Sequence, residues 1–312
     1  MEENKYPIPV RLNAILTLTV FFWSIAILIT ASKLPLLYSF PIGIGYSFLL
    51  LTSYALLHEA THLNLHADPK WNRVYGVLAG LLFPTSFSMV KITHIKHHCC
   101  NRTDHEMFDC YYENQFKYIQ ILRWYLVLLG GFWFMVPVGP ILLSLYPNVI
   151  NLKLVKEIKS SNIMFEDMKP KDVRHIREET ILGILFWCFL FFVVGLHWEQ
   201  TLVLYLCFAF NWSTRQYITH AFTKRDVVEG AHNLKASLLF EKILLNGNWD
   251  YEHHLKPALP WIYLKEEGLQ NKVIKPIGYF WQYLRLWTGP RLNTDTPPLP
   301  LPRVEYVETY ER

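Results

Sequence analysis

Long apolar runs constrain the fold of this 312-residue chain more than any other feature. Residues 12–31 form an uncharged run of the length that a bilayer requires, and residues 36–57 form a second. Residues 181–196 and 199–214 form two more, joined by a very short turn. Charged residues make up 18% of the chain, against roughly 25% in soluble domains. The sequence therefore predicts an all-α integral membrane protein with about four transmembrane helices.

Basic residues are distributed unevenly around these runs. They concentrate in residues 58–120, 147–180 and 221–312, whereas the two tight turns between paired runs hold almost none. Cytoplasmic loops of membrane proteins carry an excess of Lys and Arg. We therefore expect a multi-pass protein with the three basic segments and both termini in the cytoplasm.

A further apolar run, residues 124–146, is interrupted by Gly130-Gly131 and by Pro137. If it crossed the membrane once, the basic segment after it would lie outside the cell. A re-entrant hairpin bent at Gly130-Gly131 or Pro137 resolves this conflict. All histidine-rich segments then lie on one face of the membrane and form a cytosolic cap.

The rest of the chain suggests one domain with a short tail. Residues 74–90 are apolar but rich in Gly and Pro, so a shallow segment fits them as well as a span. Residues 259–289 mix aromatic residues with lysines, which favours a surface helix at headgroup level. We assign residues 1–290 to a single membrane domain and the Pro-rich residues 291–312 to an extended tail.

Charge and cysteine content argue against two other classes of protein. The net charge is only +4, and no nucleic-acid-binding motif is present, so we expect no nucleic-acid partner. The five cysteines form no CxxC pair, and their odd number argues against a disulfide framework.

Histidines cluster just outside the apolar runs. The spacing i, i+3, i+4 places side chains on one face of a helix, and it occurs twice, the second time with an aspartate in the first place. Neutral imidazole is the commonest protein ligand for transition metals, and a set rich in imidazole suits iron, zinc or copper. The clusters are HEATH (His58, His62), HIKHH (His94, His97, His98), RQYITH (His220) and DYEHH (Asp250, His253, His254).

Two other functions fit part of this pattern. HEATH matches HExxH, the zinc-protease motif in which the glutamate is the general base. That interpretation leaves the histidines of the other clusters without a role. A metal transporter would also use histidines, but its site should lie at mid-membrane, whereas these histidines flank the runs.

The remaining polar residues near the clusters have less specific roles. We interpret His175, His197 and His232 as interface anchors, and His66 and His105 as possible outer partners of the metal ligands. Carboxylates can orient an imidazole through its second N–H. The candidates for this role are Glu59, Asp104, Glu106 and Glu252.

The ordered set of clusters resembles the three histidine boxes of the membrane fatty acid desaturase and hydroxylase superfamily. HEATH resembles the first box, HIKHH the second, and NWDYEHHLKPALPW (248–261) the third. NWSTRQYITH (211–220) resembles the family segment that ends in an isolated histidine ligand. The resemblance covers roughly residues 35–265.

The resemblance implies a non-haem di-iron centre on the cytosolic face, with O2 as co-substrate. It also implies a lipid or fatty acyl substrate and a separate ferredoxin or cytochrome-type electron donor. Asp250 departs from the family pattern, which has histidine there, so it could bind iron directly, bind through water, or accept a hydrogen bond from a ligand. The implied metal positions are His58, His62, His94, His97, His98, His220, Asp250, His253 and His254.

Within this superfamily, removal of two neighbouring hydrogens gives a double bond, and insertion of oxygen gives an alcohol. We expect a fatty acyl desaturase first. A hydroxylase or ketolase acting on a fatty acid, a carotenoid or another terpenoid lipid is the alternative, because the two outcomes differ only in substrate placement.

Overall fold

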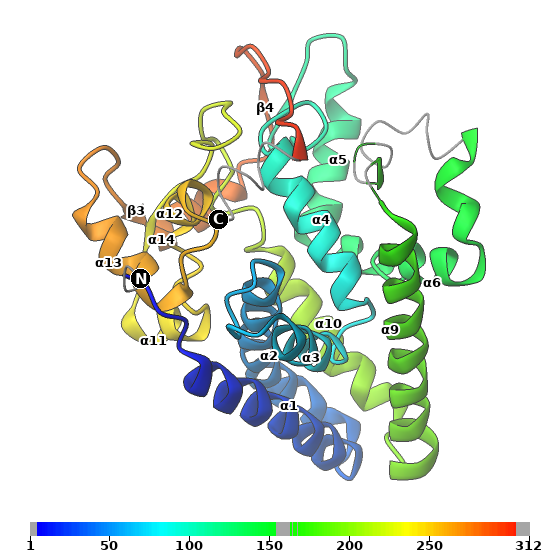
Figure 1. Cartoon of the computed structure of the whole chain (residues 1–312). Coiled ribbons are helices and arrows are strands. Elements are labelled where there is room, and N and C mark those ends of the chain that lie inside the picture. The colour runs from blue at the N-terminus through cyan, green and yellow to red at the C-terminus, as the bar shows by residue number, and fades with distance from the viewer. Residues whose placement is uncertain (1–4, 154–162, 164, 167, 304–312) are drawn as a thin grey trace.

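The structure is a computed structural model that describes residues 5–153, 163, 165, 166 and 168–303. It is mostly helical, as the sequence predicts. Figure 1 shows the long helices α1, α2, α9 and α10 in the lower part of the view and the short helices α11 to α14 on its left. The α-helices are α1 (Val10–Ser32), α2 (Ser39–Thr61), α3 (Pro69–Gly80), α4 (Phe87–Cys100), α5 (Lys117–Leu128), α6 (Val138–Leu145), α9 (Pro170–Phe189), α10 (Trp198–Ser213), α11 (Leu238–Ile243), α12 (Asp250–Leu255), α13 (Trp261–Gln270) and α14 (Tyr279–Leu286).

Two helices are long and apolar enough to cross a membrane, namely α1 and the segment Leu36–Thr61, which contains α2. Exposed aromatic side chains such as Phe22 and Trp23 on α1 suit contact with lipid. Helix α10 has only 16 residues, and α9 carries charged residues along its first half. The four-span arrangement and the cytoplasmic orientation of the cap therefore remain predictions.

The apolar run at residues 124–146 is bent, as its glycines predict. Lys117–Leu128 and Gly131–Leu145 meet at 78° and together could form one broken span or a re-entrant loop. Gly130 lies between them with φ of 96°, in the left-handed region that side-chain-bearing residues avoid. The bend thus occurs at Gly130 rather than at Pro137.

The principal core lies between α2 and α10, where the first half of α2 packs closely against the second half of α10. At Gly43 an added Cβ would lie 2.8 Å from the Cys207 Sγ, so only glycine allows this approach. Further along the pair, Asn211 Nδ2 donates to Ser47 Oγ at 2.7 Å. This contact fixes the end of α10 against α2, and His220 follows shortly after that end.

Two apolar or aromatic segments of the sequence are each divided between two helices. Residues 74–90 are divided between α3 and α4 by a turn that contains Pro84. Residues 259–289 form α13 and α14 rather than one surface helix. Pro276 lies between these helices and has no N–H to continue a helical hydrogen-bond pattern.

Two small parallel sheets connect distant parts of the cap. β1 (Cys110–Tyr111) pairs with β4 (Arg291–Leu292), and β2 (Leu234–Lys235) pairs with β3 (Ile277–Gly278). Further along, the Leu301 N–H donates to the Cys99 carbonyl at 2.8 Å. The first part of the expected tail is thus extended along the end of α4, and the domain boundary at residue 290 stays a prediction.

Candidate metal centre

The predicted metal positions come from four elements. The HIKHH histidines lie on α4, and the DYEHH residues lie on α12, so the predicted helical spacing is confirmed for both. His58 is in the last turn of α2, and His62 follows directly after that helix. His220 lies in the turns beyond α10.

The structure brings these histidines together in two groups. Within each group, one ring nitrogen from every residue lies within 4.8 Å of the corresponding atoms of the others. His98 lies between the groups, with its ring 4.3 Å from that of His254 and its Nε2 3.0 Å from that of His253. The first imidazole group is His58, His62, His94 and His253, and the second imidazole group is His97, His220 and His254.

The contacts between ring nitrogens show that a cation fits here. The Nε2 atoms of His62 and His94 are 2.7 Å apart, and those of His94 and His98 are 3.0 Å apart. A neutral Nε2 carries either one proton or one lone pair. His94 and His98 each face two other Nε2 atoms, so ordinary hydrogen bonds cannot satisfy all these contacts. Lone pairs directed at a shared metal ion would satisfy them.

The protonation states of the buried imidazoles also suit a metal. Burial lowers the pKa of His94, His98, His253 and His254 well below the ordinary value, and repulsion among the neighbouring imidazoles adds to this effect. These rings are therefore neutral at physiological pH. Neutral imidazole is the form that binds metal.

Hydrogen bonds fix the ring orientation of two members of the second imidazole group. His97 Nδ1 lies 2.6 Å from Glu106 Oε1, which confirms the expectation that Glu106 orients an imidazole. Burial opposes protonation of His97, but the Glu106 carboxylate outweighs it and raises the pKa. His220 Nδ1 lies 3.2 Å from the Gly230 carbonyl, which can only accept. The His220 proton therefore sits on Nδ1, and its Nε2 has a lone pair.

That lone pair of His220 faces a carboxylate. Asp250 Oδ2 lies 3.2 Å from His220 Nε2 and 3.9 Å from His254 Nε2. Burial raises the pKa of Asp250. Two acceptor atoms at 3.2 Å repel each other unless a proton or a metal ion lies between them. A mixed set of imidazole and carboxylate ligands suits iron or zinc.

The other carboxylates expected to orient histidines have different partners. Glu59 Oε2 accepts from the Trp261 N–H at 3.1 Å, and its Oε1 lies 3.6 Å from His58 Nδ1. Asp104 and Glu252 bond to arginine, tyrosine and asparagine side chains. Because a backbone N–H holds Glu59, the general-base role required by the protease interpretation has no support in this geometry.

The histidines outside both groups differ in environment. His66 accepts from the Asp68 N–H at 2.9 Å and so belongs to a local turn. His232, which we interpret from the sequence as an interface anchor, is half-buried and interacts electrostatically with Asp250. Burial lowers its pKa to about 4. Apart from His98, which lies between the groups, the histidines outside them are His66, His105, His175, His197 and His232.

Residues that support the site were not apparent from the sequence. Arg102 is almost fully buried, pairs with Asp109 and donates to Tyr217 Oη at 3.0 Å. Asp109 Oδ2 accepts from the Phe222 N–H at 2.6 Å. This network joins the loop after α4 to the segment that carries His220. Arg102 and Asp109 are seven residues apart, but Tyr217 and Phe222 lie more than 100 residues further along the chain, and no local pattern marks this network.

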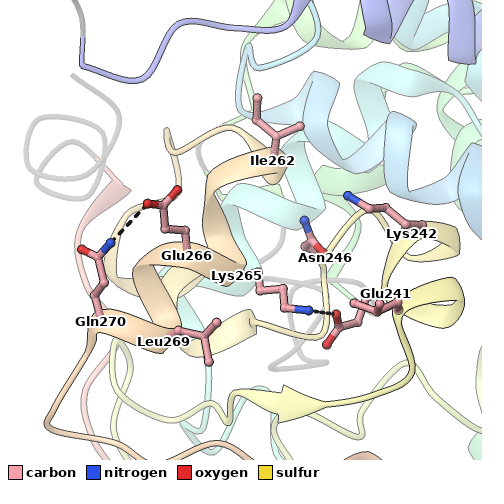
Figure 2. Close-up of a pocket in the computed structure, with 9 residues that line it drawn as sticks. Glu241, Lys242, Asn246, Ile262, Lys265, Glu266, Leu269 and Gln270 are labelled. Atoms are coloured by element: carbon pink, nitrogen blue, oxygen red, sulfur yellow. Dashed lines mark hydrogen bonds and ion pairs between the residues drawn. The ribbon is translucent and has the colours of Figure 1, made fainter.

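An open depression of about 390 Å³ lies between α11 and α13, away from the imidazole groups. Figure 2 shows Lys265 paired with Glu241 in this depression, and Gln270 bonded to Glu266 on α13. The charged side chains that line the depression largely form ion pairs and hydrogen bonds with neighbouring side chains. The depression therefore has no arrangement that would make it the reactive site.

Comparison with known proteins agrees with the geometry of the site. The family model described as fatty acid desaturase matches residues 31–272, which is more than half of the chain and includes both imidazole groups. No curated protein sequence matches the chain. The chain therefore belongs to the fatty acid desaturase family.

Proposed function

We propose that this protein is a membrane-bound, iron-dependent oxidoreductase that uses O2 to introduce a double bond into a fatty acyl chain. Membership of the family supports an oxygen-dependent lipid oxidoreductase. The observation that carries the proposal is the pair of adjacent imidazole groups, whose members are buried or half-buried. Their number and arrangement suit two metal ions.

The ligands would be the imidazoles of both groups together with His98 and Asp250. Glu106 and the Gly230 carbonyl hold the Nδ1 protons of His97 and His220, so that their Nε2 lone pairs face the centre. Bound iron would supply activation of O2 for attack on an unactivated C–H bond. The burial of His253 and His254 keeps bulk water away from that chemistry.

The reaction also requires an electron donor. Forming a double bond with O2 yields two water molecules and consumes two electrons beyond those of the removed hydrogens. We propose that an acidic ferredoxin or cytochrome binds at Arg285 and Arg291, whose guanidinium carbons lie 4.9 and 4.3 Å from the ring centre of Phe222. Neither arginine forms an ion pair within the described chain. Phe222 is two residues from His220, so this surface adjoins the second imidazole group.

Replacement of both arginines by glutamine tests this docking surface. We expect the rate of reduction by a reduced ferredoxin to fall by about tenfold at low salt, because charge complementarity speeds encounter. Arg123→Gln removes an exposed arginine of α5 and serves as the control. An unchanged rate in the double variant would refute this surface.

Product analysis tests the reaction itself. The protein is expressed in a host that is fed deuterium-labelled fatty acids, and lipids are compared with those from a His254→Ala strain. Loss of two hydrogens from an acyl chain supports the desaturase. Gain of one oxygen in an acyl lipid, or in a carotenoid, would instead support the hydroxylase or ketolase alternative.

A further inference from the structure

Arg215 lies two residues beyond α10, inside a ring of aromatic side chains. Its guanidinium carbon is 6.0 Å from the ring centre of Phe48 on α2, 5.4 Å from that of Phe240 on α11, and 5.3 Å from that of Tyr283 on α14. Stacking on aromatic faces holds a guanidinium in a defined orientation. Three elements that are distant in sequence thus converge on one cation.

The charge of Arg215 is not neutralised by the protein. Two other buried or half-buried arginines have carboxylate partners: Arg225 lies 2.8 Å from Asp104, and Arg73 lies 3.0 Å from Glu179. Within the described residues, Arg215 has no carboxylate at ion-pair distance.

The hydrogen bonds of Arg215 are also incomplete. Its Nη1 donates to the Asn211 carbonyl at 2.8 Å, to Asn211 Oδ1 and to Thr214 Oγ1 at 3.4 Å, whereas its Nε is buried and has no acceptor in the part of the chain that the structure describes. A half-buried cation with an unused donor is costly unless an anion is supplied from outside.

The surroundings of Arg215 suit a lipid. Leu238 and Leu239 on α11 are 71% and 73% exposed, and Trp281 on α14 is 72% exposed. These residues belong to the same two helices that contribute Phe240 and Tyr283 to the aromatic ring. Exposed apolar and aromatic side chains around a cation are typical of the headgroup level of a membrane.

The distance to the metal centre suits an acyl chain. Phe48 and His58 are ten residues apart on α2, which is about 15 Å at the rise of an α-helix. Half of the ~30 Å hydrocarbon core, the depth that one acyl chain fills, is also about 15 Å. A lipid held by its head group at Arg215 therefore carries a chain long enough to reach the first imidazole group.

We propose that Arg215, with Phe48, Phe240 and Tyr283, binds the phosphate of an anionic membrane phospholipid. The identification of this phospholipid as the substrate rests on the proposed function. The acyl chain that reacts would belong to a phospholipid, and neutral carotenoid or terpenoid lipids would lack the group that Arg215 recognises.

Native mass spectrometry of the full-length protein in detergent tests the site. Phosphatidylglycerol and diacylglycerol with identical acyl chains serve as probes. We expect the wild type to retain phosphatidylglycerol and not diacylglycerol, and Arg215→Gln to weaken phosphatidylglycerol binding by about tenfold or more. Arg215→Lys keeps the charge but loses the planar stacking, so it should bind with intermediate affinity and covers the case in which Arg215→Gln does not fold.

Three outcomes would overturn the proposal. Equal phosphatidylglycerol affinity in the wild type and the Arg215 variants would show that Arg215 does not bind the phosphate. If Arg123→Gln, which removes an exposed charge, lost as much phosphatidylglycerol affinity as Arg215→Gln, the lipid would be held by non-specific electrostatic attraction. Displacement of the lipid by millimolar inorganic phosphate would show a site for free phosphate. Iron content measured on the same samples tests the proposed function separately, because lipid retention does not depend on iron.

Discussion

Asp250 is the residue at which this chain departs from the three-histidine-box pattern. The sequence left three roles open for it. Its Oδ2 lies 3.2 Å from His220 Nε2 and 3.9 Å from His254 Nε2, and we propose that it is a fourth ligand beside the second imidazole group. The first imidazole group has no carboxylate among its members. We therefore expect the two metal ions to be inequivalent, one bound by neutral imidazoles alone and one by a mixed set.

Replacing Asp250 with alanine tests this interpretation. Iron should fall from about two ions per chain to about one, because the second group loses a ligand while the first stays intact. Asp250→His should restore the second ion. Mössbauer spectra of the wild type should show two distinct signals. Asp295→Ala alters an exposed carboxylate and serves as the control. Two irons retained in Asp250→Ala would contradict direct binding.

Glu106 acts on the metal only through His97. Removing such a carboxylate typically weakens metal binding by about 10–100-fold, so we expect a loss of this order in Glu106→Ala. Glu106→Gln keeps an acceptor for the His97 Nδ1 proton and should lose less. Competition with a metal chelator measures the affinity. Glu113→Ala changes an exposed carboxylate and serves as the control, which should bind metal as tightly as the wild type. If Glu106→Ala also bound metal as tightly as the wild type, the orienting role of Glu106 would be disproved.

Among the elements, the bend between α5 and α6 depends most on one residue. Gly130→Ala places a side chain in the left-handed region and should lower the free energy of unfolding by about 1–2 kcal/mol. Gly183→Ala on α9 meets no atom within 4 Å and should be neutral or slightly stabilising. Denaturation of the detergent-solubilised protein compares the two. Equal stability of both variants would show that the bend tolerates a side chain.

Sequence patterns predicted those features of the elements that depend on local spacing. The intervals in HIKHH and DYEHH predicted helices, and Gly130 predicted the bend. The partners of these residues were not predictable. Which imidazoles share a group depends on how α2, α4 and α12 converge, and the orientation of His220 depends on a carbonyl ten residues away at Gly230. Likewise, the pairing of Arg102 with Asp109 has no periodic signal.

At the scale of the whole molecule, the long helices and the histidine-rich cap both contribute side chains to the candidate metal centre. Helix α2 links them, because its apolar length suits a membrane and its last turn carries His58. The cap contributes α12 and the His220 segment, which the buried network around Arg102 holds against the loop after α4. A metal centre at this junction can receive a chain from the membrane and electrons from the opposite side.

Metal analysis of the purified full-length protein, by mass spectrometry and Mössbauer spectroscopy, tests this account most directly. It predicts about two irons per chain, with the second ion lost in His97→Ala and both imidazole groups impaired in His98→Ala. A single zinc with no iron, or iron content unchanged in both variants, would contradict it.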